Sequence, residues 1–93
     1  MRQLVWRPMA RDDRAAIMDY IARENPVAAL ELDELIEAKA ALLSIRPRLY
    51  KPGRIKGTRE MLVHPHYVVV YQEDKQTVTI LRVLHTAQQW PPA

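Results

Sequence analysis

Cysteine is absent from the 93 residues of this chain. Its absence excludes a disulfide framework, a thiolate metal site and a cysteine nucleophile, and it suits a reducing cytoplasm. Long apolar runs are missing too: no stretch approaches the roughly 18 apolar residues that cross a bilayer, and residues 1–10 lack the apolar centre of a secretory signal. We therefore expect a soluble, cytoplasmic protein with no membrane partner.

Glycine is scarce. The two glycines, Gly53 and Gly57, both lie in residues 46–57, a connector that also carries Pro47 and Pro52. This connector is the one long loop that the sequence predicts. No phosphate-binding glycine loop, nucleophile elbow or paired-carboxylate motif is present. Because there is also no internal repeat or low-complexity tract, the sequence predicts a single domain over residues 1–93.

The net charge of +3 is small, but the charges are unevenly distributed along the chain. Eight of the 11 acidic residues lie between Asp12 and Glu37. Six basic residues stand against the single acid Glu60 in positions 46–60: Arg46, Arg48, Lys51, Arg54, Lys56 and Arg59. One end of the fold should therefore be electropositive, which is explained equally well by a polyanionic partner or by a solvated loop.

Apolar periodicity divides the chain into a helical part and a strand-rich part. Helices are expected over residues 8–24 and 26–45, with Asn25 as N-cap and Pro26 at the first helical position of the second helix. Strands rich in Val, Ile, Thr and Tyr are expected over 3–6, 57–63, 66–72 and 77–84. The polar residues 73–76 predict a hairpin between the last two strands.

This order of elements predicts an α+β fold. A short N-terminal strand, placed at a sheet edge because Pro8 follows it, leads into a helical hairpin and then a three-strand antiparallel meander. We expect the helices to pack on one face of a four-stranded antiparallel sheet. In the first helix, Ile17, Tyr20 and Ile21 are expected to form the apolar stripe that faces the core.

The second helix has more apolar positions than one core face requires. Leu32, Leu35, Ile36, Leu42 and Leu43 lie on one side, and Leu30, Ala38, Ala41 and Ile45 on another. The helix is either buried from two sides by its own domain or partly covered by a partner. We favour a partner that covers Leu30, Leu35, Leu42 and Ile45, bound as a helix in a groove or by strand addition.

Three histidines invite a metal site, but their pattern argues against one. His64 and His66 have the same-face spacing of a strand, yet Pro65 disrupts regular pairing and no nearby acid completes a ligand set. His85 stands alone at the end of the last strand. We expect no metal and no other cofactor.

Arginines, a histidine and tyrosines near the last strands are the remaining candidates for chemistry. In a ribonuclease, Arg59 and Arg82 would stabilise a phosphate under attack while His85, or a tyrosine (Tyr67 or Tyr71), handled the proton. Arg82 lies inside an apolar strand and cannot be buried unpaired, so an ion pair with a helix acid is an equal alternative. Trp90, in a tail that ends in two prolines, is expected to fill a gap in the core.

The order of several short motifs resembles the ParE branch of the ParE/RelE superfamily, the toxins of bacterial type II toxin–antitoxin modules. The motifs are Asp19-Tyr20-Ile21-Ala22, Asn25-Pro26, Pro52-Gly53-Arg54, Gly57-Thr58-Arg59-Glu60, His66-Tyr67-Val68-Val69-Val70-Tyr71 and Leu81-Arg82-Val83-Leu84-His85. The resemblance spans nearly the whole chain. It implies a cognate antitoxin partner, a toxin–antitoxin hetero-oligomer and the strand order of that family.

One departure from the superfamily bears on the target. Its messenger-RNA-cleaving members usually carry an arginine immediately before the segment that matches Val69-Val70-Tyr71, whereas this chain has Val68 there. The resemblance therefore favours the ParE branch, whose members poison DNA gyrase. The tail Thr86-Ala87-Gln88-Gln89 differs from the arginine-containing tail common in that branch, which leaves the target open.

Three functions follow. The first is a plasmid-stabilising type of toxin that binds DNA gyrase through Arg59, Arg82, His85 and Trp90 and is not itself an enzyme. The second is a ribosome-dependent messenger-RNA endoribonuclease that uses Arg59, Arg82 and His85. The third, with least support, is a basic nucleic-acid-binding module without toxicity.

Overall fold

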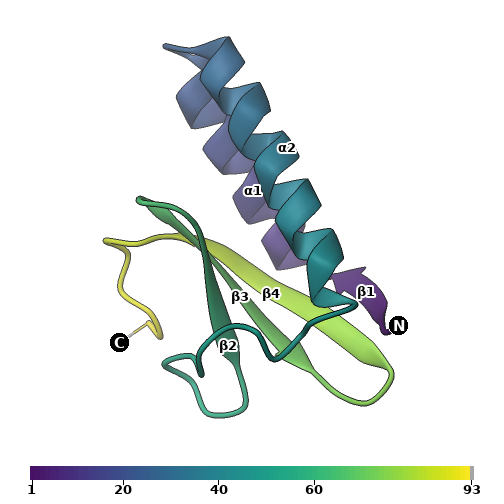
Figure 1. The fold of residues 1–93 in the computed structure, drawn as a ribbon. Coiled ribbons are helices and arrows are strands. Elements are labelled where there is room, and N and C mark those ends of the chain that lie inside the picture. Colours follow the sequence, from purple (N-terminus) through teal and green to yellow (C-terminus); the bar gives the residue numbers. More distant parts are fainter. Residues whose placement is uncertain (93) are drawn as a thin grey trace.

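The computed structural model describes residues 1–92 and forms an α+β domain, as the sequence predicts (Figure 1). In chain order its elements are β1 (Gln3–Trp6), α1 (Pro8–Ala22), α2 (Pro26–Leu43), β2 (Arg59–His64), β3 (Tyr67–Glu73) and β4 (Thr77–His85). The predicted order of elements is confirmed, and both helices end two residues before their predicted bounds. The Asn25 side chain accepts a hydrogen bond from the Ala28 N–H at 3.0 Å, which confirms it as the N-cap of α2.

The sheet has the order β1-β4-β3-β2, so β1 lies at an edge, as expected. The expectation of a fully antiparallel sheet is wrong, because β1 pairs with β4 in parallel. The helical hairpin returns the chain to the end of the sheet where β1 begins, and the Arg2 N–H donates to the Ser44 carbonyl at 2.9 Å. β2 consequently starts at that end, and the two reversals of the meander leave β4 running in the direction of β1.

Both faces of the sheet carry apolar clusters of unequal size. The larger cluster lies under the helices and contains Ile36 and Leu43 of α2 together with Val69, Tyr71 and Ile80 of the sheet. The smaller cluster, on alternate strand positions, joins Val68, Val70 and Leu84 to the half-buried Leu81 and Trp90. The seven residues of β3 include five that are buried because this central strand is covered on both faces.

The core faces of the helices differ in part from the predicted stripes. In α1, Ile17 and Ile21 pack on the core with Met18, but Tyr20 is exposed, so its predicted place in the stripe is wrong. In α2, the buried positions are Ala29, Leu32, Ile36, Ala40 and Leu43. Leu35 and Leu42, which the sequence groups with this side, lie outside it and remain exposed. No helix in the described part of the chain is long and apolar enough to span a membrane.

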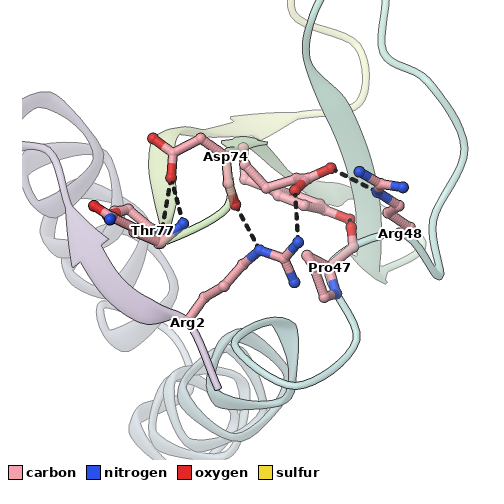
Figure 2. A network of polar contacts seen from close by, with 8 residues as sticks. Arg2, Pro47, Arg48, Asp74 and Thr77 are labelled. Carbon is pink, nitrogen blue, oxygen red and sulfur yellow. Dashed lines mark hydrogen bonds and ion pairs between the residues drawn. The ribbon is translucent and has the colours of Figure 1, made fainter.

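Polar contacts join the start of the chain, the connector and the β3–β4 turn (Figure 2). Glu73 accepts ion pairs from Arg2 at 3.4 Å and from Arg48 at 3.0 Å. The Arg2 guanidinium also donates to the Asp74 carbonyl, and the Asp74 carboxylate accepts the Thr77 N–H at 2.8 Å. These contacts hold the turn against the first strand.

The buried Tyr71 of β3 binds the connector through a hydrogen bond. The Tyr71 hydroxyl donates to the carbonyl of Pro47 at 2.6 Å, and Tyr71 itself is fully buried. Burial raises the pKa of Tyr71 to about 12. The one long loop of the chain is thus fixed to the core at Pro47, although proline and glycine suggested only a turn-rich connector.

Candidate functional site

Arg82 of β4 is held by an ion pair with α1. Its Nε donates to Asp13 at 2.7 Å and its second guanidinium nitrogen donates to the other carboxylate oxygen at 3.0 Å. The hydrogen bond and the charge of Asp13 raise the pKa of Arg82. The structural alternative, an ion pair with a helix acid, is confirmed.

Asp13 has a second role, at the edge of the sheet. β1 pairs with β4 only as far as the register pair Trp6–Ile80, so the rest of β4 has no strand neighbour on that side. Asp13 accepts the Val83 N–H at 3.0 Å and so satisfies a backbone donor that β1 does not reach. The sequence did not identify Asp13 as the partner of Arg82, because the spacing of residues along α1 does not show that this helix crosses β4 at Asp13.

Trp90 lies against the smaller apolar cluster and beside Arg82. The Arg82 guanidinium carbon is 5.5 Å from the centre of the indole ring, a cation–π contact. The indole N–H is buried and has no hydrogen-bond partner within residues 1–92. Trp90 therefore fills a gap on the outer face of the sheet, as the sequence predicts.

Arg59 stands at the start of β2 and is half-buried. It donates to the carbonyl of Tyr50 at 2.7 Å and pairs in the sheet with Tyr71, on the face of the larger cluster. Arg82 pairs with Val70, which belongs to the opposite face. The two arginines therefore do not point toward one common site.

His85 lies at the other end of the sheet from Arg59. It pairs with Tyr67 while Arg59 pairs with Tyr71, so four positions of β3, or about 13 Å at roughly 3.3 Å per residue, separate them. Arg59, Arg82 and His85 do not converge in the structure. Their roles in target binding or cleavage remain predictions.

Around His85, the structure instead brings the three histidines together. The rings of His66 and His85 are stacked with centroids 5.6 Å apart, His64 lies 5.5 Å from His66, and the Tyr67 ring meets His85 edge-on at 5.3 Å. Pro65 lies at the tip of the β2–β3 turn, and this turn is what brings His66 to His85.

The hydrogen bonds of this cluster oppose metal binding. Nδ1 of His64 accepts the His66 N–H at 3.1 Å, and Nδ1 of His85 accepts the Ala87 N–H at 3.0 Å. A neutral imidazole that accepts at Nδ1 carries its proton on Nε2, the nitrogen that would have to bind the metal. Within residues 1–92, no three potential ligand side chains are placed to hold a metal ion.

The basic connector is partly neutralised. Arg48 pairs with Glu73, and Arg54 pairs with Glu60 at 3.1 Å. Burial alone would raise the pKa of Glu60, but hydrogen bonds from the Arg54 guanidinium and N–H, together with the positive charges of Arg54 and Lys51, lower it below the ordinary value. Within the connector, the basic residues left exposed without an ion pair to another described residue are Arg46, Lys51 and Lys56.

The four apolar side chains predicted to bind a partner are all exposed, but they do not share one surface. Their exposed fractions are 60% for Leu30, 39% for Leu35, 61% for Leu42 and 59% for Ile45. Leu35 lines a groove of about 410 Å³ beside the histidines, with Ile21, Ala28, Glu31, Leu32, His64, His66 and Tyr67. Leu42 and Ile45 line a second groove of about 440 Å³, with Leu43, Arg46, Leu49 and Tyr50, and Leu30 lines neither.

Leu49 was missed by sequence reasoning. It is 64% exposed and extends the second groove into the connector. Its position just beyond a predicted helix gave no sign that the chain folds back there. The one signal in the sequence is a leucine among the basic residues of the connector.

Comparison with known proteins gives a consistent family. Residues 4–90 match the model of the "ParE toxin of type II toxin-antitoxin system, parDE". The chain is 34% identical over 90 residues to Toxin RelE2 of Caulobacter vibrioides, covering 95% of this chain and 99% of that protein. It is 38% identical over 73 residues to Y4kP, a candidate toxin of Sinorhizobium fredii, covering 77% of this chain and 75% of that protein.

Solved structures agree on the fold. The chain matches the chromosomal ParDE toxin–antitoxin system of P. aeruginosa with a TM-score of 0.81 at 22% identity, covering 91% of this chain and 96% of that one. It matches the E. coli DinJ–YafQ toxin–antitoxin complex with a TM-score of 0.65 at 15% identity, covering 96% and 97%. At these identities the likeness concerns the fold alone.

Proposed function

Because this chain belongs to the ParE family of type II toxin–antitoxin toxins, we propose that it inhibits growth by poisoning DNA gyrase and is neutralised by a cognate antitoxin. Membership of the family supplies the toxin class. The choice of gyrase rests on the resemblance to the ParE branch and on one observation, the buried valine at position 68.

Val68 is buried with Val70 and Leu84 on the outer face of the sheet, beside Trp90. In the cleaving members of the superfamily an arginine is usual at this position. A buried valine offers no charge to a phosphate under attack. Arg82, the nearest cation in the adjacent strand, is already paired with Asp13. Neither position therefore offers a free cation for RNA cleavage, which supports a toxin that binds its target over one that cleaves RNA.

Messenger-RNA cleavage on the ribosome is the second candidate. Two observations favour it: the relative from Caulobacter vibrioides is named Toxin RelE2, and His66 and His85 are stacked at one end of the sheet. Two histidines in that arrangement could exchange a proton with a substrate. Of the two arginines predicted for this chemistry, Arg59 lies at the opposite end of the sheet and Arg82 is paired with Asp13.

Adding purified toxin to DNA gyrase and, separately, to translating ribosomes distinguishes the two functions. We expect gyrase to accumulate cleaved DNA while messages on translating ribosomes stay intact. If the chain cleaves messages, His85→Ala should lower the rate by roughly the 10²–10³-fold lost with one transition-state group. His85 is exposed, so this variant tests chemistry without the loss of the Arg82–Asp13 ion pair that Arg82→Ala would cause. Cleavage of messages with gyrase unaffected would overturn the assignment to gyrase.

Target contact is tested at the remaining predicted positions. Arg59→Ala, Arg82→Ala and Trp90→Ala should weaken gyrase poisoning while the antitoxin still binds through the helices. Arg82→Lys is the control for Arg82, because it keeps the charge while losing the two-point contact with Asp13. Equal toxicity of all variants, at equal folded concentration, would remove these residues from the contact surface.

The proposed antitoxin site consists of exposed apolar side chains of α2 and of the residues just after it: Leu30, Leu35, Leu42 and Ile45. The matched structures from P. aeruginosa and E. coli are toxin–antitoxin systems, which supports a partner of this kind. An amphipathic helix or strand of the antitoxin would cover these side chains. We expect the antitoxin to be encoded by the reading frame next to that of the toxin.

Substitution of Leu42 by Glu should weaken antitoxin binding by at least roughly tenfold, because the antitoxin would have to bury an unpaired charge. Met9→Glu is a matched control, since Met9 is 59% exposed and lies at the start of α1, away from both grooves. Isothermal titration with the purified antitoxin measures both variants. Equal affinities for the two would contradict the placement of the antitoxin on α2.

A further inference from the structure

The last described residues, 86–92 (the tail), turn back beside the sheet after β4, on the side away from the helices (Figure 1). Trp90 packs there on the outer-face cluster of Val68, Val70 and Leu84. Its indole N–H is buried without an acceptor among residues 1–92, which lowers the stability of this position. Beyond Gln88, no residue up to 92 takes part in a hydrogen bond. The cover over the cluster therefore depends on the packing of one indole ring and on the contacts at the start of the tail.

Three histidines fasten the start of the tail to the β2–β3 turn. The Thr86 N–H donates to the His66 carbonyl at 2.8 Å, and the His66 N–H donates to Nδ1 of His64 at 3.1 Å. The Ala87 N–H donates to Nδ1 of His85 at 3.0 Å, and the His85 ring stacks on the His66 ring. We call His64, His66 and His85 the histidine latch.

The two Nδ1 atoms of the latch accept hydrogen bonds only while their imidazole rings are neutral. A protonated imidazole carries a hydrogen on each nitrogen and has no acceptor left. Proton uptake therefore replaces each of these hydrogen bonds by two hydrogens that face each other. Positive charges on His66 and His85, whose ring centroids are 5.6 Å apart, would also repel. Histidine is the side chain that ordinarily changes charge between about pH 5 and pH 8.

The other titratable groups beside the latch do not oppose its opening. Tyr67 contacts the rings of His64 and His85, and burial and the nearby Tyr20 raise its pKa, so its phenol stays neutral in this range. Glu31 of α2 lines the groove beside His64 and His66, where a carboxylate favours protonated histidine. The outer face adds three charged residues, which share a groove with Thr86 but not with the histidines: Lys51, Arg54 and Glu60.

We propose that the tail is a cover that the neutral histidine latch holds over the outer-face cluster and that proton uptake opens. In the closed state Trp90 shields Val68, Val70 and Leu84, and in the open state these side chains and the indole ring face water. Losing one neutral hydrogen bond shifts a local equilibrium by roughly 2- to 10-fold, and the latch loses two. The proposal concerns the chain alone and does not depend on the assignment of the target or of the antitoxin.

Acrylamide quenching of tryptophan fluorescence measures the position of the cover, because this neutral quencher reaches the Trp90 indole more readily when the tail is open. Trp6→Phe leaves Trp90 as the single tryptophan. We expect its quenching constant to rise at least roughly threefold from about pH 7.5 to about pH 5.5. Trp90→Phe, in which Trp6 reports on β1, is the matched control and should show no such rise. Circular dichroism at both pH values establishes that each variant is folded, and the difference between the wild type and Trp90→Phe gives the same quantity without Trp6→Phe.

Substitutions in the latch test its mechanism. Both Nδ1 atoms accept from the N–H two residues further on, which is the spacing at which an asparagine side chain accepts from the backbone without taking up a proton. The double variant His64→Asn/His85→Asn should therefore keep the tail closed at both pH values, whereas His64→Ala/His85→Ala should open it at both. Glu31→Gln should leave the acid-induced opening in place.

Five results would overturn the proposal. The first two are a quenching constant of Trp90 that does not change with pH and a parallel rise for Trp6, which would indicate unfolding of the whole domain. The others are an opening that persists in the asparagine double variant, an alanine double variant that stays closed, and an opening that Glu31→Gln abolishes.

Discussion

The ion pair between Asp13 and Arg82 should be the polar contact on which the stability of this fold depends most. Asp13→Ala removes three contacts at once: the two from the Arg82 guanidinium, at 2.7 and 3.0 Å, and the one from the Val83 N–H, at 3.0 Å. It leaves both a charge and a backbone donor without a partner, at side chains that are only 18% and 16% exposed in the pair.

The expected loss in the free energy of unfolding is worked out from the contacts that Arg82 and the Val83 N–H lose. Breaking a buried ion pair by removing one partner costs about 3–5 kcal/mol, and an unsatisfied buried donor costs about 1–3 kcal/mol. Arg82 keeps partial access to water and its contact with Trp90, so we expect a total near ~2–4 kcal/mol. For a domain of this size, about 1 kcal/mol lowers Tm by about 4–8 °C, so Tm should fall by at least ~8 °C.

Urea denaturation followed by circular dichroism measures the change in the free energy of unfolding. Asp12→Ala is the matched control: Asp12 is the neighbouring residue, is exposed, and should cost less than ~0.5 kcal/mol. The double variant Asp13→Ala/Arg82→Leu should regain part of the loss, because the unpaired charge is then gone. If Asp13→Ala costs no more than Asp12→Ala, Asp13 does not support β4 as described.

Three further predictions concern stability. Tyr71→Phe should lower the free energy of unfolding, measured in urea, by about 1–3 kcal/mol, because it leaves the Pro47 carbonyl without its donor. In the wild type, the phenol of Tyr71, whose pKa is raised to about 12, should ionise only near that pH, which an absorbance titration of the tyrosines measures. The pKa of Glu60 is lowered in the folded state, so the stability that this carboxylate contributes is present above the ordinary carboxyl pKa and is lost as the pH falls through the lowered value. Glu60→Gln should therefore reduce the dependence of the unfolding free energy on pH below about pH 5. An unchanged dependence would show that the contact between Glu60 and Arg54 is not its cause. Asn25→Ala should cost about 1 kcal/mol through loss of the α2 N-cap, and Asn25→Gly distinctly less.

The order of helices and strands could be predicted from the sequence because it depends on local properties. Apolar spacing, the Asn25 cap and the β-branched runs act within a few residues, and they placed every element. The gap-filling role of Trp90 and the ion pair of Arg82 were also predictable in kind, since a buried charge must find a partner. The motif order that marks the toxin family is likewise a property of the sequence.

What the tertiary structure decided depends on which distant segments meet. The parallel pairing of β1 with β4 follows from where the helical hairpin returns the chain. Eight acidic residues lie between Asp12 and Glu37, and Asp13 is the one that pairs with Arg82 because α1 crosses β4 there. The separation of Arg59 from His85, and the gathering of the three histidines, are consequences of strand register. The exposure of Leu35 and Leu42 depends on the rotation of α2 against the sheet. Local sequence determines what each segment can form, whereas contacts between segments far apart in the chain determine which side chains share a surface.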